Sequence, residues 1–242
     1  MEYSMTFLTL DYWGLLAALV IGFAFLFMGS YGAVFVLFMI YFLTLSSIVT
    51  VVGRKRKELL GVYEKGRGVG NVLSNAAGPL VMALFYMSAE LALRPELALL
   101  FLAGFASAVA SITADKFSSE IGVLDGMPRS IFTLRRARKG ASGAVTVLGL
   151  AAGLLAALII ALTFAGTAGA GAARLLPHAP VYLYMVVGIT VGGFLGTLID
   201  SAFGFFEELG FGNKFTSNLV CGVMGGLFGM LLVAALLGLM SL

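Results

Sequence analysis

Runs of about 20 apolar residues recur from one end of this sequence to the other, and they limit the folds open to it. A helix that spans the roughly 30 Å hydrocarbon core of a bilayer needs a run of this length. Of the 242 residues, 60% are hydrophobic and only 11% are charged, whereas a soluble domain carries about 25% charged residues. The alternating residues of a membrane β-barrel strand are absent. The sequence therefore predicts an all-α, polytopic membrane protein with a single domain over residues 1–242.

Seven helices fit the apolar runs. The first run extends from Trp13 to Val52, which is too long for one span, and residues 29–32 (GSYG) interrupt it near its middle. Glycines of this kind are typical of a turn. We expect helices over residues 12–29, 31–52, 71–92, 96–114, 143–166, 181–199 and 217–240.

Charge is distributed unevenly between the two ends of these helices. Three polar segments fall on one side: residues 53–70, 115–143 and 200–217. The first two segments hold six lysines and arginines each and the third holds Lys214, which leaves only Arg94 and Arg174 for the other side. Loops rich in lysine and arginine stay in the cytoplasm. We therefore expect a protein of the cytoplasmic (plasma) membrane, with these segments in the cytoplasm and the N-terminus outside.

Two aspartates, Asp115 and Asp200, follow directly after the expected helices at 96–114 and 181–199. A carboxylate at a helix C-terminus opposes the helix dipole, which is a cost unless a cation lies nearby. A shared Mg²⁺ would relieve both, and magnesium prefers one or two carboxylates together with phosphate oxygens and water. Pairing of each aspartate with a loop arginine is the alternative.

Polar residues surround these aspartates in the sequence. Ser119 lies four residues after Asp115 and shares its helical face. Glu120 follows in the same segment, and Lys116 and Ser201 are the direct neighbours of the two aspartates. Acids in or beside membrane helices are functional candidates by default. By contrast, we expect Glu207 and Glu208 to lie in a solvated turn.

Two glycine-rich segments precede expected helices, GRGVGN at 66–71 and KGASG at 139–143. Glycines let backbone N–H groups approach an anion, and a helix N-terminus favours negative charge. The first segment lacks the lysine of a P-loop and follows no strand, so a simple glycine-rich turn with a helix cap is the alternative. The candidate anion-binding residues are Arg67, Gly68, Gly70, Asn71, Asn75, Lys139, Gly140, Ser142 and Gly143.

Further candidates lie outside these segments. Arg129 suits bidentate binding of a phosphate, and Asn218 enters the last helix, where an amide needs partners. Arg135, Arg136 and Arg138 fit phosphate ligands, anchors for anionic lipids or determinants of topology. Acids that hold a divalent metal beside bases that hold phosphate, at a membrane edge, predict a site for a phosphorylated, lipid-like substrate.

The order of these motifs resembles the integral membrane family catalogued as domain of unknown function 92, which includes plant phytyl-phosphate kinase and animal transmembrane protein 19. The chain departs from the residues usual in that family at Lys116, Ala141, Ala144 and Lys214. The matching segments are GRGVGNVLSNAAGPL (66–80), ASITADKFSSEIG (110–122), PRSIFT (128–133), KGASGAVTVLG (139–149), GTLIDSAFG (196–204) and NLVCG (218–222).

The resemblance implies a kinase that transfers a phosphoryl group from a nucleoside triphosphate, with CTP as the expected donor, to an isoprenoid monophosphate such as phytyl or geranylgeranyl phosphate. It implies that Asp115, Glu120 and Asp200 are catalytic residues that bind Mg²⁺, while glycine-rich helix ends and Arg129 hold phosphate oxygens. Phosphoryl transfer depends on positioning and charge neutralisation more than on covalent chemistry. The prenyl tail would lie between helices, open to membrane lipids. We expect no nucleic-acid partner.

Two other functions stay open from the residues alone. A transporter or flippase of a phosphorylated lipid or small anion would need polar residues that continue through the membrane, and such residues are few and scattered here. A cytidylyltransferase would use the same kind of site but release pyrophosphate. The oligomeric state is open as well.

Overall fold

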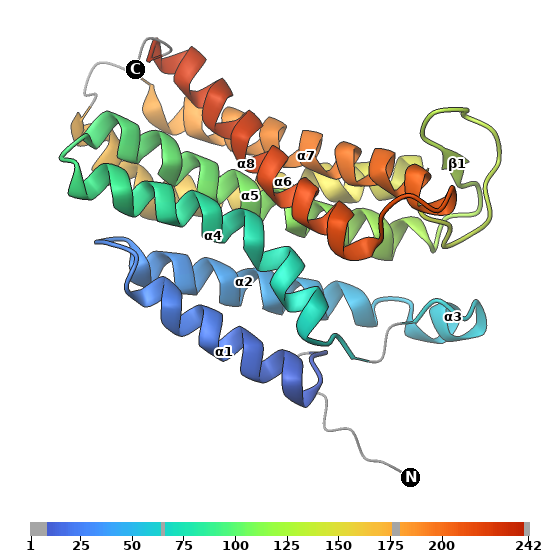
Figure 1. Ribbon diagram of the computed structural model, residues 1–242. Helices are drawn as coiled ribbons and strands as arrows, with labels where there is room; N and C mark the ends of the chain where they lie inside the picture. Colours follow the sequence, from blue (N-terminus) through green and yellow to red (C-terminus); the bar gives the residue numbers. More distant parts are fainter. Residues whose placement is uncertain (1–8, 64–65, 176–179, 240–242) are drawn as a thin grey trace.

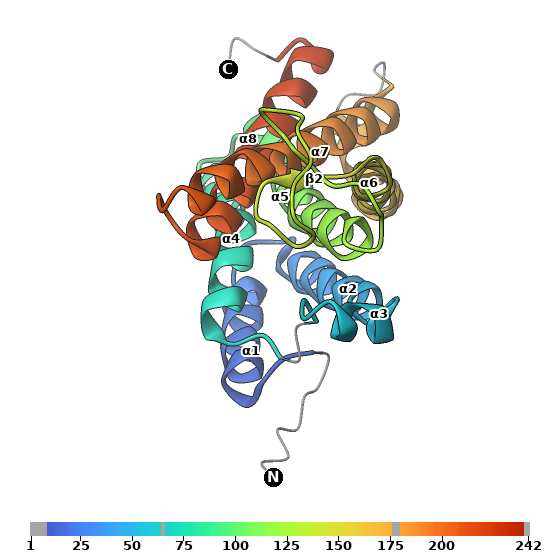
Figure 2. The ribbon, with the colours of Figure 1, turned by 90° about the vertical axis from the view of Figure 1, so that its right-hand side faces the viewer.

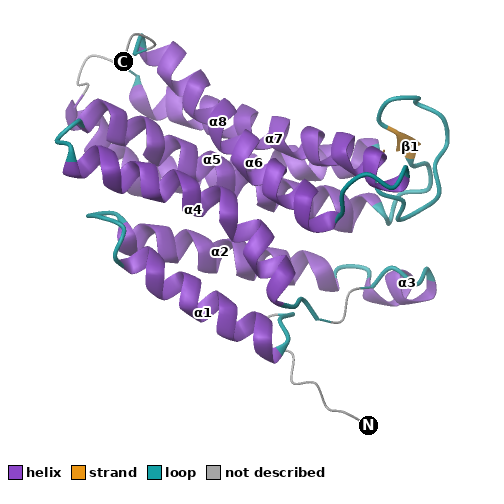
Figure 3. Ribbon diagram, viewed as in Figure 1, coloured by secondary structure: helices purple, strands orange, loops and turns teal. Residues whose placement is uncertain are grey.

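The computed structural model describes residues 9–63, 66–175 and 180–239. This part of the chain is almost entirely helical, with one small β-hairpin (Figures 1 and 3). Its helices are α1 (Tyr12–Leu26), α2 (Gly32–Val51), α3 (Arg54–Leu59), α4 (Val69–Leu91), α5 (Pro95–Gly122), α6 (Val147–Leu175), α7 (Val181–Glu208) and α8 (Lys214–Leu237). The strands β1 (Arg129–Ser130) and β2 (Ala144–Val145) pair antiparallel, with Arg129 opposite Val145 and Ser130 opposite Ala144.

Six of the described helices are long and apolar enough to cross a bilayer, namely α2, α4, α5, α6, α7 and α8. Helix α1 is a shorter apolar helix of 15 residues, about 22 Å long at 1.5 Å per residue. The predicted all-α, polytopic membrane fold is confirmed. The orientation of the N-terminus depends on whether α1 spans the bilayer, so it stays a prediction.

Helix α5 forms the centre of the bundle. It contacts α2, α4, α6, α7 and α8, and Figure 2 shows it enclosed by these neighbours. In the 18-residue apolar stretch that could span the membrane, 89% of α5 is buried inside the protein, whereas the corresponding share is 39% in each of α6, α7 and α8. Small residues such as Ala103, Ala106 and Ala110 are fully buried along it, and they let the surrounding backbones approach closely. A polar residue on α5 is therefore held in a fixed position.

Helix α4 bends near its middle and joins two parts of the molecule (Figure 1). Pro79 lies inside the helix, where it removes one backbone hydrogen bond and forces a kink. At the neighbouring Gly78, a side chain would collide with the backbone of Gly222, so α4 and α8 are in close contact at this point. The N-terminal half of α4 consequently diverges toward α1, which it also contacts.

Helices α5 and α7 continue past the ends that the apolar runs predict. Asp115 lies seven residues before Gly122, the last residue of α5, and Asp200 lies eight residues before Glu208, the last of α7. The prediction that these aspartates oppose a helix C-terminal dipole is therefore wrong. An apolar run in the sequence ends where the helix leaves the lipid. The residues that follow, such as serine, glutamate and phenylalanine, can still continue the helix.

Helix α6 begins later than expected, at Val147 rather than at residue 143. The hydroxyl of Thr146 caps it by accepting a hydrogen bond from the backbone N–H of Gly149 at 3.0 Å. The glycine-rich segment 139–143 is thus a loop that leads into β2 and not the first turn of a helix. Its predicted placement at a helix N-terminus is wrong.

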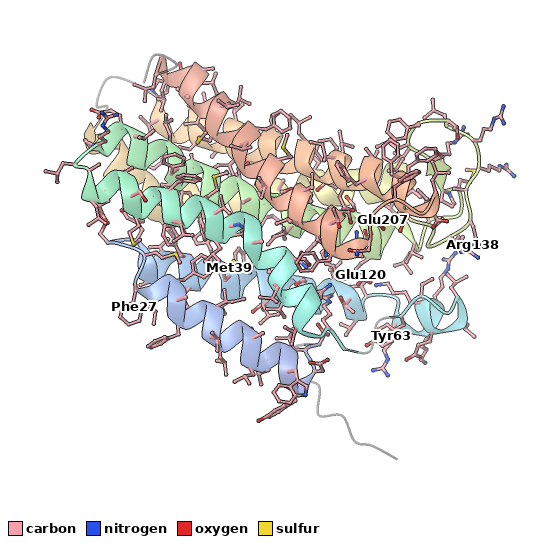
Figure 4. The ribbon with its side chains drawn as sticks, in the orientation of Figure 1. Phe27, Met39, Tyr63, Glu120, Arg138 and Glu207 are labelled. Carbon is pink, nitrogen blue, oxygen red and sulfur yellow. The ribbon has the colours of Figure 1, made fainter. Side chains whose placement is uncertain are left out.

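The polar segments gather at one end of the molecule. Helix α3, the hairpin with β1, and the start of α4 all lie at that end in Figures 1 and 2, and the turn between α7 and α8 lies there too. Figure 4 labels Tyr63, Glu120, Arg138 and Glu207 there and Phe27 at the opposite end. The polar segments that the sequence assigns to one side therefore also lie at one end of the folded molecule.

Candidate functional site

A cavity of about 250 Å³ lies at this polar end. Its wall combines α4, α5, α7, α8 and the loop 139–144. Gly68, Gly70 and Arg129 lie outside the lining, but the other predicted site residues all contribute to it. Those that line the cavity are Arg67, Asn71, Asn75, Asp115, Lys116, Ser119, Glu120, Lys139, Gly140, Ser142, Gly143, Asp200, Ser201 and Asn218.

Asp115 of α5 and Asp200 of α7 form a pair in the cavity wall. Both are buried, at 7% and 5% exposure, and they are close enough for each carboxylate to interact with the charge of the other. Lys214 Nζ donates to Asp200 Oδ2 at 2.9 Å. The other oxygen of that carboxylate, Oδ1, is buried without a hydrogen-bond partner among the described residues. Lys214 and, more weakly, Lys116 are the cations that act on Asp115.

Contacts one turn away fix the register of this pair. Thr197 Oγ1 donates to the carbonyl of Ser111 at 3.2 Å, which ties α7 to α5. Ser111 Oγ in turn donates to the carbonyl of Cys221 at 2.9 Å, which ties α5 to α8. These three buried residues hold the helices at one level, so the aspartates that follow Ser111 and Thr197 in the chain face the same space.

Glu120 has the opposite surroundings. Its Oε2 accepts from Lys57 Nζ at 2.7 Å, and its Oε1 lies 3.2 Å from Lys116 Nζ and 3.8 Å from Arg67 Nη2. Thr50 Oγ1 donates to the same Oε1 at 3.0 Å. This carboxylate is surrounded by cations from three segments of the chain.

Lys57 is a residue that the sequence analysis missed. It belongs to a run of four basic residues, 54–57, which favours a solvated or membrane-facing segment. The structure instead buries Lys57 completely, where its Nζ also donates to the carbonyl of Thr50 at 3.0 Å. A basic run has the same composition whether one member turns inward or none does, so the sequence carried no signal that Lys57 is buried.

The aspartate pair fits a magnesium ion better than the three-acid set does. Within the described ranges, no three His, Cys, Asp or Glu side chains converge as a metal site, so Glu120 does not join the pair. Asp200 Oδ1 and Asn218 Oδ1 are buried oxygens without a hydrogen-bond partner there. Magnesium takes one or two carboxylates and completes its shell with phosphate oxygens and water, which matches Asp115 and Asp200.

The loop 139–143 is fastened to α7. The backbone N–H of Ser142 donates to Glu208 Oε1 at 3.0 Å, and Ser142 Oγ donates to Glu207 Oε2 at 3.2 Å. Gly143 has a φ of +73°, and a side chain there would collide with the backbone of Phe205. Glu207 and Glu208 are therefore part of α7 and anchor this loop, so the predicted turn is wrong, while Glu208 is exposed to solvent as predicted.

The segment 66–68 is fastened in a similar way. The N–H of Arg67 donates to the carbonyl of Thr9 at 2.9 Å, and its carbonyl accepts from the N–H of Asp11 at 3.2 Å. Helix α4 then begins at Val69, and Gly68 caps it without a side-chain hydrogen bond. Arg67 thereby enters the cavity wall from a fixed backbone.

Two amides complete the wall from α4 and α8. Asn75 Nδ2 donates to the carbonyl of Asn71 at 2.8 Å, and Asn218 Nδ2 lies 3.3 Å from Ser74 Oγ. Asn218 is buried, and a buried amide needs hydrogen-bond partners, as the sequence analysis expects.

Arg129 does not reach this group. Its side chain is exposed, and Nη1 donates to the carbonyl of Leu134 at 3.2 Å within the same hairpin. Arg135, Arg136 and Arg138 are exposed too; Figure 4 labels Arg138 on this loop. The structure thus assigns Arg129 to the hairpin and leaves the loop arginines facing solvent.

The family model described as integral membrane protein DUF92 matches residues 2–214. The chain belongs to this family. An uncharacterized membrane protein of Methanocaldococcus jannaschii is 31% identical to this DUF92 chain over 236 residues, which cover 94% of the chain and 87% of that protein. Protein PGR of Arabidopsis thaliana is 32% identical over 188 residues, 72% of the chain and 63% of PGR. No solved structure matches.

Proposed function

We propose that this chain is a phosphotransferase of the membrane that transfers a phosphoryl group from a nucleoside triphosphate, with CTP as the expected donor, to an isoprenoid monophosphate. One observation carries the proposal. A buried pair of aspartates, several cationic side chains and a glycine-rich loop line a single cavity at the polar end of an apolar helix bundle. A water-soluble nucleotide and a phosphate on a membrane-embedded lipid can both reach a polar cavity only where it lies at the membrane surface.

The charges of the cavity suit two phosphorylated ligands. Arg67, Lys116, Lys139 and Lys214 supply positive charge in the wall, and phosphoryl transfer relies on this kind of charge neutralisation. The aspartate pair repels a bare phosphate, which favours a nucleotide that arrives with a divalent cation. Magnesium bound at Asp115 and Asp200 would supply charge neutralisation for the donor phosphate oxygens.

The remaining residues hold and orient the ligands. Lys139 and the backbone of the anchored loop 140–143 face the cavity from the side of α7, and Asn71 and Asn75 face it from α4. An acceptor phosphate is already ionised near neutral pH, so no strong general base is required. One of its oxygens bonds to the γ-phosphorus, the bond to the nucleoside diphosphate breaks, and that diphosphate leaves with the electron pair.

The proposal also implies which side of the membrane the cavity opens to. The polar segments carry most of the basic residues of the chain, and such segments stay in the cytoplasm. We therefore place the cavity at the cytoplasmic face of the plasma membrane, where nucleoside triphosphates are available.

A direct assay tests the activity. The purified protein in mixed micelles receives Mg²⁺, geranylgeranyl or phytyl phosphate, and CTP or ATP. We expect the isoprenoid diphosphate and a nucleoside diphosphate in equal amounts. Failure with every donor, while a plant phytyl-phosphate kinase works in parallel, would overturn the proposal. Release of pyrophosphate would identify a cytidylyltransferase, and flux into proteoliposomes without nucleotide consumption would identify a transporter.

A further inference from the structure

A second, smaller cavity of about 90 Å³ lies between α1, α2 and α4. Its lining is almost entirely apolar and includes small residues that leave space between the helices, Ala18 and Gly22 on α1 and Ala76 on α4. Met39 and Leu43 line it from α2, and Figure 4 labels Met39 where α2 runs beneath α4. We call this space the apolar groove.

The apolar groove adjoins the larger polar cavity. Phe42, Arg67, Asn71 and Asn75 line both. A ligand that crosses this boundary therefore meets hydrocarbon on one side and a guanidinium with two amides on the other. An amphiphile with an anionic head group has this chemistry.

The bilayer borders this part of the molecule. Helix α1 packs on α2 and α4, and Leu19 and Phe23 on its other face are 63% and 64% exposed. Apolar residues exposed to this extent on a membrane helix contact lipid. A chain that leaves the apolar groove enters the hydrocarbon core directly.

We propose that the apolar groove holds the part of the acceptor's hydrocarbon tail nearest its phosphate, while the rest of the tail lies in the bilayer. This inference rests on the proposed function, because it names the substrate part that the groove binds. Pockets that enclose a whole drug-sized ligand measure about 300–1,000 Å³. The groove, at about 90 Å³, encloses only the first portion of a prenyl chain. The enzyme therefore recognises a tail without measuring its full length.

Filling the groove tests this inference. A Cβ atom added at Gly22 meets no atom within 4 Å, so the side chain of Gly22→Phe starts in open space beside the groove, and phenylalanine is no worse than glycine in a helix. We expect the KM for geranylgeranyl phosphate, as a mole fraction in mixed micelles, to rise about tenfold. The KM for CTP should not change.

Gly166→Phe is the matched control. Gly166 on α6 is exposed and also has no atom within 4 Å of an added Cβ, yet it lies outside both cavities. Its kinetics should equal those of the wild type. An active Gly22→Phe variant with an unchanged KM for the lipid overturns the groove and leaves the kinase intact.

Tail length provides a second kinetic test. Burial of one further isoprene unit would lower the KM by more than about tenfold. We expect geranyl, farnesyl and geranylgeranyl phosphates to differ by less than that. A steep and continuing dependence on length would contradict a groove that holds only the first portion.

Photolabelling tests the groove without any turnover. The probe is a prenyl phosphate with a diazirine on its first isoprene unit, and labelled peptides are mapped by mass spectrometry. We expect labels on α1 and on the part of α2 around Met39, with loss of labelling when geranylgeranyl phosphate competes but not when phosphatidylcholine does. Labels elsewhere, or equal competition by phosphatidylcholine, overturn the inference. A labelled groove in a protein that transfers no phosphate overturns the proposed function alone.

Discussion

The single carboxylate of Glu120 and the pair Asp115 and Asp200 line the same cavity, but their surroundings differ in charge. Glu120 lies among Lys57, Lys116 and Arg67, and the Nζ of Lys57 is fully buried beside it. Asp200 pairs with Lys214, whose side chain is 53% exposed, and Lys116 acts on Asp115 more weakly than Lys214 does. The first group is rich in positive charge and the second is short of it.

This difference distinguishes a group that stabilises the fold from a group that is available to bind a ligand. A buried ion pair stabilises a fold only when its hydrogen bonds are nearly complete, because desolvation of the charges is costly. Both oxygens of Glu120 and the ammonium of Lys57 meet this condition, and their contacts join α2, α3, α5 and the segment 66–68. The aspartate pair does not, since Asp200 Oδ1 has no partner among the described residues. An incomplete group of this kind is suited to a ligand that arrives later.

Asp200→Asn tests the incomplete group and should have the largest effect. The amide keeps the shape of the side chain but removes the charge that would hold a cation, so we expect phosphoryl transfer to fall by a factor on the order of 10³. Membrane insertion and the thermal unfolding midpoint in detergent should stay close to the wild type. Asp115→Asn should behave in the same way.

Asp125→Asn is the control for that pair of variants. Asp125 lies in the same polar segment, but its Oδ1 accepts only the neighbouring N–H of Gly126, at 2.6 Å, and it is outside the cavity lining. Its activity should be unchanged. Wild-type turnover in both Asp115→Asn and Asp200→Asn would refute the assignment of the cation to these two residues.

Glu120→Gln tests the complete group. Loss of the carboxylate leaves the fully buried Lys57 without its ion partner, and breaking a buried pair in this way costs about 3–5 kcal/mol. We expect a large drop in the thermal unfolding midpoint and a low yield of folded protein. A Lys57→Met change in the same chain should restore part of the stability.

Glu58→Gln is the matched control, because Glu58 pairs with Arg54 at 2.8 Å on the exposed face of α3. Exposed pairs contribute little, so stability should not change. A stable Glu120→Gln protein that has lost only its activity would instead place Glu120 with the aspartates, as the three-acid metal set predicts.

The fold class and the polar end follow from the sequence because the bilayer fixes both. Apolar runs of spanning length allow little besides helices, and the basic residues of segments 53–70 and 115–143 mark one side. Asp115 and Asp200 were found in the same way, since acids are rare in such runs. These signals depend on composition along the chain and not on how the helices pack.

Features that depend on packing escaped this reasoning. The apolar run before Asp115 ends, but α5 continues to Gly122, where Glu120 pairs with Lys57 and Gly122 packs against Gly149 of α6. The burial of Lys57 depends on where α3 meets Glu120, and the anchoring of Ser142 depends on where α7 ends. No local pattern records these long-range contacts.

Lys214→Met sharpens the comparison by leaving the aspartate pair without its lysine. Lys214 Nζ lies 2.9 Å from Asp200 Oδ2, where it would compete with a metal ion for this carboxylate. We expect the Mg²⁺ concentration for half-maximal activity to fall about three- to tenfold, because one repelling charge is removed. Without Mg²⁺ the thermal unfolding midpoint should fall, since two buried carboxylates lose their lysine. A higher KM for CTP with an unchanged Mg²⁺ requirement would show that Lys214 binds phosphate instead.

Ser142→Ala should have the smallest effect, because it removes one of two bonds that fasten the loop 139–143. The hydroxyl bond to Glu207 at 3.2 Å is lost, but the backbone bond to Glu208 at 3.0 Å stays, so the cost is about 1 kcal/mol or less. We expect transfer to fall by less than about fivefold, and Glu207→Gln should match it. If Ser142→Ala abolished transfer while Glu207→Gln did not, the hydroxyl would contact the ligand, and this loop would belong with the aspartates rather than with the Glu120 group.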